Sequence, residues 1–135
     1  MNDFNLKIGM LGEARTKVTY ENTAIKYGSG SVSVFATPAM IGLMEKASIN
    51  SVDSYLPKGY ATVGTKVEIK HIAATPIDME VVAQSELLEI DGLKLKFKVE
   101  AYDGKEKIGE GTHTRYIIYL DDFIKKVESK KNSQE

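Results

Sequence analysis

The stretch VFATPAMIGLMEKAS, residues 34–48, predicts the element around which the rest of the chain folds. Thr37 and Pro38 are typical of a helix start, because threonine caps free backbone N–H groups and proline needs no hydrogen bond in the first turn. From Ala39 to Ile49 most positions are apolar. A helix that is apolar on nearly every side is buried rather than laid on a surface. The stretch therefore predicts one long central helix.

After this helix the chain changes from a helical to an alternating pattern, which is typical of strands. We expect strands over residues 61–76, 79–90, 93–102 and 106–120, with hairpin turns at Asp91-Gly92 and Asp103-Gly104. The glycines at 109 and 111 indicate a bulge or a close approach of another backbone. Because helices and strands do not alternate, the pattern predicts an α+β fold, in which a curved antiparallel sheet wraps around the central helix.

The remaining segments predict one domain with short extensions. We expect a loose N-terminal arm over residues 1–12, a single domain over 13–127 and a solvated tail over 128–135. Within the domain, residues 13–27 predict one or two short strands and residues 31–35 another. A helix that is buried on most sides needs more cover than one small sheet provides, so we expect a homodimer.

Composition excludes several function classes. The 135 residues carry a net charge of -1, which gives no reason to expect a nucleic-acid partner or an anionic membrane surface. The chain has no cysteine, so disulfides, thiolate metal sites and cysteine nucleophiles are absent. Its two histidines are too few for a zinc site unless carboxylates complete it, and we expect no metal. We find no signal peptide and no apolar run long enough to span a membrane, and we expect a cytoplasmic protein.

Glu45 is notable because it places a carboxylate among apolar helix residues. An ionised carboxylate inside a core costs several kcal/mol unless it has a partner. Gly42 lies one turn earlier and opens space in which a substrate or a water molecule fits beside the carboxylate. Alternatively, Glu45 belongs with Lys46 and Ser48 to an exposed polar strip of the helix, and the residues alone leave both interpretations open.

His71 is a second candidate, because the alternation of its strand puts it on one face with Val63, Thr65, Val67 and Ile69. An imidazole at a strand end can act as a base or a proton donor near neutral pH. The simpler interpretation is a half-exposed histidine with one hydrogen bond. We expect the carboxylate of the central helix to face this imidazole across a cleft.

Thr37 is a third candidate. Its hydroxyl either caps the helix or helps to hold a thioester carbonyl against the free N–H groups and the positive dipole end of the helix. Thr37 and Glu45 lie roughly 12 Å apart along a helix. Both can therefore serve one substrate only in a groove along the helix, with His71 on the facing sheet.

Two weaker candidates lie on strands. Gly64 permits a close approach of a ligand to the backbone. Arg115 shares a strand face with His113, and it either holds a phosphate or carries a solvated charge.

With these residues identified, the chain resembles the hotdog-fold thioesterases, and within them the fluoroacetyl-CoA thioesterase-like family. The resemblance runs from about Gly12 to Val127 and rests on three segments in register: ATPAMIGLMEKA (36–47), TVGTKVEIKHIAATP (62–76) and IGEGTHTR (108–115). It implies a hotdog fold, in which the sheet wraps the long helix. It also implies a homodimer with its active sites at the interface.

The resemblance implies catalytic roles for Thr37, Glu45 and His71, and substrate contacts by Gly64 and Arg115. Glu45 would then face the thioester, as a nucleophile or as the base that activates water. His71 would polarise or protonate, and Thr37 would position the acyl group or the carbonyl. Gly42 joins the substrate-binding set because of the space that it leaves.

The expected function is hydrolysis of a short or medium acyl-CoA to the free acid and CoA, with no cofactor. Residues 27–34, YGSGSVSV, are short and rich in glycine and serine, whereas the fluoroacetate-specific enzyme carries a longer, aromatic- and proline-containing lid. One alternative is a non-catalytic acyl-CoA binding module. Another is a hotdog hydratase or dehydratase of enoyl thioesters, but these enzymes usually carry Asp and His near the helix start, where this chain has Thr37.

Overall fold

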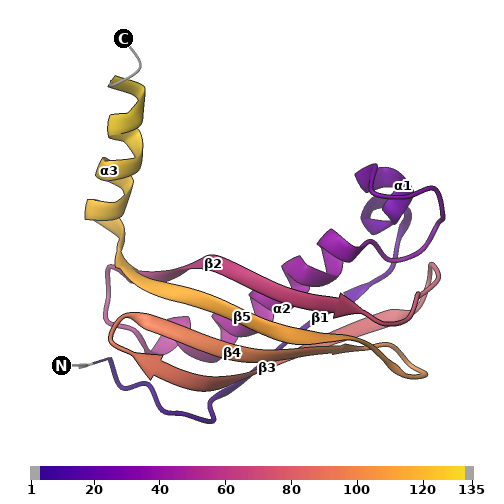
Figure 1. The fold of residues 1–135 in the computed structure, drawn as a ribbon, viewed down its shortest axis with the longest axis horizontal. Helices are drawn as coiled ribbons and strands as arrows, with labels where there is room; N and C mark the ends of the chain where they lie inside the picture. The colour runs from indigo at the N-terminus through magenta and orange to yellow at the C-terminus, as the bar shows by residue number, and fades with distance from the viewer. Residues whose placement is uncertain (1–3, 133–135) are drawn as a thin grey trace.

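The structure is a computed structural model that describes residues 4–132 of the 135-residue chain. Its elements follow along the chain (Figure 1) in the order β1 (Leu11–Lys17), the 3-10 turn η1 (Tyr20–Asn22), α1 (Ala24–Tyr27), α2 (Thr37–Val52), the 3-10 turn η2 (Asp53–Tyr55), β2 (Tyr60–His71), β3 (Glu80–Asp91), β4 (Lys94–Tyr102), β5 (Lys107–Tyr119) and α3 (Leu120–Asn132).

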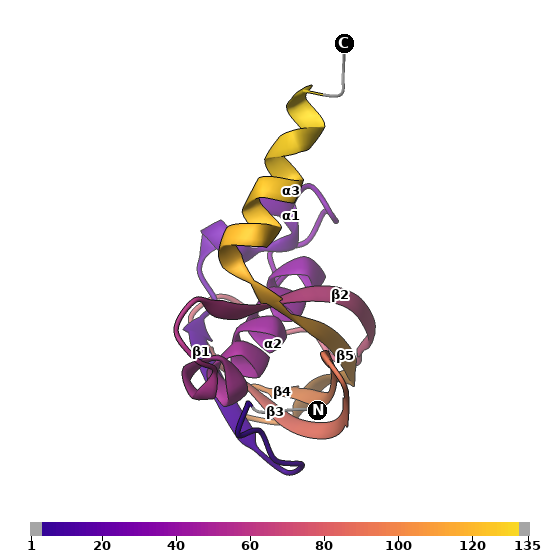
Figure 2. The ribbon, with the colours of Figure 1, turned by 90° about the vertical axis from the view of Figure 1, so that its left-hand side faces the viewer.

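The strands form one antiparallel sheet in the order β1-β3-β4-β5-β2, so β1 and β2 are its edges. Hairpins join β3 to β4 and β4 to β5, where the two Asp-Gly pairs predicted turns. Figure 2 shows the sheet curving around α2, which lies in its concave side. The predicted α+β architecture is confirmed.

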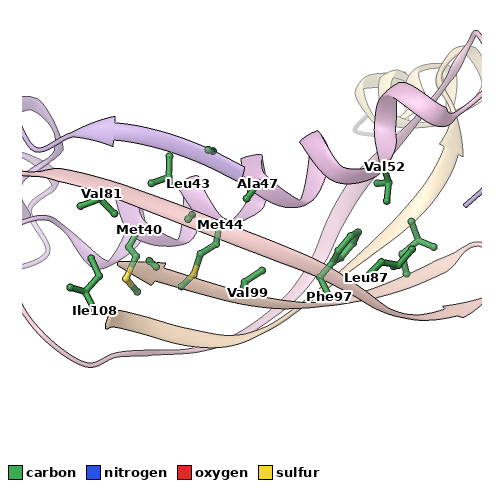
Figure 3. Packing of buried hydrophobic residues seen from close by; sticks show 14 of the residues in the cluster. Met40, Leu43, Met44, Ala47, Val52, Val81, Leu87, Phe97, Val99 and Ile108 are labelled. Carbon is green, nitrogen blue, oxygen red and sulfur yellow. The ribbon is translucent and has the colours of Figure 1, made fainter. Parts of the chain in front are cut away.

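The core lies between α2 and the concave face of the sheet (Figure 3). The helix contributes the buried side chains of Met40, Leu43, Met44, Ala47 and Val52, and the sheet contributes those of Val81, Leu87, Leu95, Phe97, Val99 and Ile108. Burying each of the larger side chains stabilises the fold by about 1.5–3 kcal/mol.

Gly109 on β5 allows α2 to approach the sheet closely. A Cβ atom at this position would lie 2.5 Å from the sulfur of Met40, which is well inside contact distance. The close backbone approach that the glycine pattern indicated is present at Gly111, where a Cβ atom would overlap the carbonyl oxygen of Glu68 on β2.

The start of α2 differs from the predicted one. Ala36 is the N-cap residue and makes no side-chain capping bond, while Thr37 is the first helical residue and Pro38 the second. The interpretation of Thr37 as the cap is therefore wrong. Its hydroxyl is left to bond elsewhere, which matters for the site below.

The N-terminal half contains less strand than predicted. Of residues 13–27, only the part within β1 is strand, and the chain then turns into η1 and α1. Residues 31–35 form no strand, because Phe35 and Val34 make only isolated bridges to Thr23 and Pro76. These bridges fix the loop that leads into α2, and α1 lies beside the start of that helix (Figure 1).

Strand β2 contains a bulge at Thr65 that the sequence pattern did not predict. Before the bulge Gly64 pairs with Arg115, and after it Val67 pairs with His113. Arg115 and His113 are both buried beneath the helix. The bulge therefore shifts the helix-facing positions of β2 from even to odd residue numbers.

This shift corrects the predicted face of His71. Val63 and Thr65 do not share its face, and Thr62, which is only 6% exposed, takes the inward position before the bulge. The simple alternation fails because one extra residue in a strand reverses the side to which every later side chain points.

The described parts of both predicted extensions are structured. In the arm, residues 1–12, Leu6 is buried in the core and the strand begins at Leu11. In the tail, residues 128–135, the part up to Asn132 continues α3, which projects from the body (Figures 1 and 2). Residues 1–3 and 133–135 lie outside the described residues. Across residues 4–132 we find no helix with the length and apolar character needed to cross a membrane.

Candidate functional site

Thr37 and His71 form a direct pair at the start of α2. The Thr37 hydroxyl oxygen lies 2.7 Å from Nδ1 of His71, across 34 residues of sequence. The pair exists because the first residue of the helix meets the last residue of β2. The hydrogen bond replaces the capping bond that the sequence suggested for this hydroxyl.

The other ring nitrogen of His71, Nε2, is shielded from solvent and has no hydrogen-bond partner among the described residues. Burial lowers the pKa of His71 below its ordinary value, and the backbone of Ala73 opposes part of this shift. The pair borders an open pocket of about 310 Å³, which is lined by Ala24, Ser29, Val34, Phe35, Thr37 and residues 71–74. A neutral imidazole with a free nitrogen can accept or deliver a proton at a bound substrate.

Glu45 belongs to a second cluster, further along α2. Its carboxylate Oε2 lies 4.0 Å from Nε2 of His113, and its side chain is 40% exposed. The imidazole that faces Glu45 within one chain is thus His113 of β5, whereas the sequence led us to expect His71. The pocket beside Glu45 measures about 490 Å³ and is lined by Gly42, Glu45, Lys46, Ile49, Asn50, residues 62–64 and Arg115.

Arg115 is 5% exposed, so the interpretation of its guanidinium as a solvated charge is wrong. Its Nε donates to the Thr62 hydroxyl and its Nη2 to the Thr62 carbonyl oxygen, both at 2.8 Å. Its Nη1 lies 3.1 Å from Nε2 of His113. The Thr62 hydroxyl in turn donates to Asp53 at 2.7 Å. Burial lowers the pKa of Arg115, opposed by the carboxylates of Asp53 and Glu45.

Two glycines leave the space that this cluster requires. A Cβ on Gly42 would meet nothing within 4 Å, so the opening expected one turn before Glu45 is present. A Cβ on Gly64 would lie 3.0 Å from the Glu45 carboxylate and 3.2 Å from Nη1 of Arg115. Gly64 therefore lets β2 pass directly in front of the carboxylate and the guanidinium.

The predicted site residues thus divide into two groups within one chain. Thr37 and His71 lie together, and Glu45 lies with Gly64 and Arg115, while the two pockets share no lining residue. No cluster of three or more His, Asp or Glu side chains within residues 4–132 is arranged to bind a metal ion.

His113 also belongs to the cluster around Glu45, although the sequence did not identify it as a site residue. It is 1% exposed and contacts both Arg115 and the region of Glu45. The sequence does indicate that His113 and Arg115 lie on one face of a strand, because they are two positions apart. The sequence did not indicate that this face lies next to Glu45, because the bulge in β2 determines which side chains meet there.

The chain is similar to known fluoroacetyl-CoA thioesterases in both sequence and structure. Residues 18–121 match the sequence pattern of the fluoroacetyl-CoA-specific thioesterase (FlK) family. The chain is 42% identical over 97 residues to the fluoroacetyl-CoA thioesterase of Streptantibioticus cattleyicolor, over 72% of this chain and 70% of that protein. It is also similar to a variant of the fluoroacetyl-CoA thioesterase FlK solved in complex with acetyl-CoA. The TM-score is 0.87 at 34% identity, over 93% of this chain and 98% of that chain.

A more distant structure shares the architecture. A hot-dog-like protein from Thermanaerovibrio acidaminovorans gives a TM-score of 0.86 at 21% identity, covering 96% of this chain and 97% of that chain. Identity at this level bears on the fold alone. The expected hotdog arrangement of sheet and helix is confirmed.

Proposed function

Because the chain belongs to the fluoroacetyl-CoA-specific thioesterase family, we propose that it hydrolyses the thioester of a short acyl-CoA to the free acid and coenzyme A. The observation that carries the proposal is the 2.7 Å contact between the Thr37 hydroxyl and His71 at the start of α2. A helix start supplies free N–H groups and a positive dipole end, which stabilise the oxyanion that forms when a thioester carbonyl is attacked. A proton-transfer group and an oxyanion-binding element therefore lie beside one open pocket.

His71 is the proton carrier of the proposed reaction. Its lowered pKa keeps the ring neutral near neutral pH. If Nδ1–H donates to the Thr37 hydroxyl, the lone pair of Nε2 is free to accept a proton. Hydrolysis adds the hydroxyl of water to the acyl carbon, breaks the C–S bond and returns the proton to the CoA sulfur. An imidazole that accepts the proton early and releases it to sulfur late serves both steps.

Glu45 supplies the carboxylate of the proposed site. It either attacks the acyl carbon and displaces the CoA thiolate, forming an anhydride that water then opens, or it takes the proton of the attacking water in place of His71, and His71 then passes that proton to the CoA sulfur. Arg115 and Gly64 border the same pocket, and they are proposed to contact the substrate. Turnover in ¹⁸O-water tests the nucleophile role, because label enters the Glu45 carboxylate only if an anhydride forms and water opens it at the glutamyl carbon.

We propose that the complete site forms between two copies of the chain. The Thr37 and Glu45 positions are separated by roughly 12 Å along α2 within one copy. Strand β2 is a sheet edge, and an edge strand readily pairs with another chain. Antiparallel pairing of two β2 strands about a two-fold axis brings His71, at one end of β2, toward the half of the partner's strand that carries Gly64.

The activity is tested by incubating the protein with acetyl-, fluoroacetyl-, propionyl-, butyryl- and hexanoyl-CoA and a thiol-reactive dye. Because the chain has no cysteine, the dye reports released CoA alone. Release by the wild type that is lost in Glu45→Gln and His71→Ala, both still folded, supports hydrolysis. Binding of acyl-CoA without release favours the binding module instead.

The shared site is tested by mixing the two inactive variants. After a 1:1 mixture is unfolded and refolded together, half of the dimers are mixed, and each mixed dimer has one intact site if the site is shared. Activity then recovers to about a quarter of the wild-type value. If each chain holds a complete site, the mixture stays inactive. Light scattering on the wild type should give the mass of a dimer or a larger assembly, and an active monomer would contradict the shared site.

A further inference from the structure

We propose that His113 is a positioning residue of this site: its Nε2 lone pair holds the Arg115 guanidinium in place beside Glu45. The inference rests on the proposed function and adds to it a residue that acts through Arg115 rather than on the substrate. The inference follows from the two hydrogen-bond partners of the His113 ring, one of which can only accept a hydrogen bond and the other only donate one.

The hydrogen bonds of His113 determine where its ring proton lies. Nδ1 is 2.8 Å from the carbonyl oxygen of Lys66, and a carbonyl can only accept, so Nδ1 carries the proton. Nε2 is 3.1 Å from Nη1 of Arg115, and a guanidinium can only donate, so Nε2 presents its lone pair. Both neighbours thus select the neutral ring with Nδ1 protonated.

The position of Lys66 explains why this arrangement depends on the fold. Lys66 follows the bulge at Thr65, which changes the direction of the β2 backbone groups at this point. The ring of Phe97 lies near the imidazole, with ring centres 6.3 Å apart. The contacts of its two ring nitrogens therefore fix both the orientation and the protonation of His113.

Arg115 depends on this acceptor because its other anchors come from a single residue. All three of its hydrogen bonds go to uncharged acceptors, two on Thr62 and one on His113. A guanidinium has five N–H groups, so about two remain for other acceptors, and Arg115 lines the pocket beside Glu45. Without the lone pair of His113, Nη1 would lose its fixed direction and a buried N–H group would be left unpaired.

A matched pair of variants separates positioning from simple packing. In His113→Gln the side-chain oxygen can reach the place of Nε2 and accept from Arg115, but the bond to Lys66 is weakened. In His113→Asn the amide can keep the bond to Lys66, but it is too short to reach Arg115. If His113 acts through Arg115, the Asn variant loses about tenfold in kcat/KM, mainly through a higher KM, and the Gln variant stays within about threefold of the wild type.

Equal losses in the two variants, or a greater loss in Gln than in Asn, would overturn the proposal. A cycle with Arg115→Met adds a second criterion. Once Arg115 is removed, His113→Asn should cause almost no further loss of kcat/KM, because the effects of substituting two interacting residues do not add. Additive losses would mean that His113 acts by another route. Thermal unfolding of each variant checks that it folds.

A spectroscopic readout needs no activity. The chain has two histidines, so His71→Ala leaves His113 as the only one, and ¹⁵N-histidine NMR then reports its tautomer directly. We expect the neutral Nδ1–H form, which is the minor form of free histidine. The Nε2–H form would refute the inference. If the wild type hydrolyses no acyl-CoA, the proposed function fails, while this experiment still decides the state of His113.

Discussion

Replacing Gly64 by alanine would place one methyl group between Glu45, His113 and Arg115. The added Cβ would lie 3.0 Å from the carboxylate oxygen of Glu45, 3.0 Å from Cε1 of His113 and 3.2 Å from Nη1 of Arg115. Non-bonded heavy atoms are most stable at about 3.5–4.0 Å. At least one of the three side chains must therefore move by about half an ångström.

Glu45 is the group that moves. His113 and Arg115 are 1% and 5% exposed and are held by hydrogen bonds, whereas the Glu45 side chain is 40% exposed and its carboxylate oxygen lies 4.0 Å from Nε2 of His113. A displacement of about 1 Å at a reacting group costs on the order of a hundredfold in rate, so half of that distance should cost about tenfold in kcat.

The stability of Gly64→Ala should change little. Overpacking lowers the free energy of unfolding by about 1 kcal/mol or more. The smaller conformational entropy of the unfolded chain offsets about 0.4–1 kcal/mol of this loss. A change of 1 kcal/mol shifts the Tm of a domain of this size by about 4 °C. We therefore expect a Tm within about 4 °C of the wild type together with a tenfold lower kcat.

The assay is acyl-CoA hydrolysis beside thermal unfolding, with Gly104→Ala as the matched control. A Cβ on Gly104 would make an ordinary 3.6 Å contact with Met79, in the hairpin between β4 and β5. The control should keep both activity and Tm. Full activity in Gly64→Ala would refute the reasoning, because it would mean that the reaction does not depend on the position of Glu45.

Three other predictions test other parts of the structure. Thr37→Val should lower kcat at least about tenfold while Thr37→Ser keeps most of it, because only serine retains the hydroxyl that bonds His71; equal rates would remove the hydroxyl from the mechanism. Burial lowers the pKa of both His71 and His113 below 6.5, so the unfolded chain binds more protons as the pH falls. The free energy of unfolding therefore has its full value above about pH 6.5 and falls as the pH falls through the lowered pKa values of the two histidines. Tm should decline on acidification, and less steeply in His71→Gln. An equal decline in the variant would contradict the lowered pKa of His71 in the folded protein. Gly12→Ala should destabilise the fold by about 3 kcal/mol in urea unfolding, because its Cβ would overlap the Ala47 carbonyl oxygen where β1 packs on α2; a stability equal to that of the wild type would show that this contact is not tight.

The sequence by itself determined the central helix, the three strands that follow β2 and the family. Local patterns carry this information. Apolar residues on most sides predict burial of α2, strict alternation predicts β4, and Asp-Gly pairs predict the hairpins. Thr37, Glu45 and His71 were identifiable because each puts a polar group where the local pattern predicts an apolar one or a helix start.

Only the tertiary structure decided which of these groups meet. The bulge at Thr65 reverses the side of β2 that faces the helix, and this brings Gly64 to Glu45 and pairs Val67 with His113. A bulge depends on the pairing of two strands, so the sequence of one strand does not reveal it. For the same reason the sequence did not reveal that, within one chain, Glu45 lies 4.0 Å from the imidazole of His113. Partners across a sheet are fixed by register and burial, which arise only when all the strands pack around the helix.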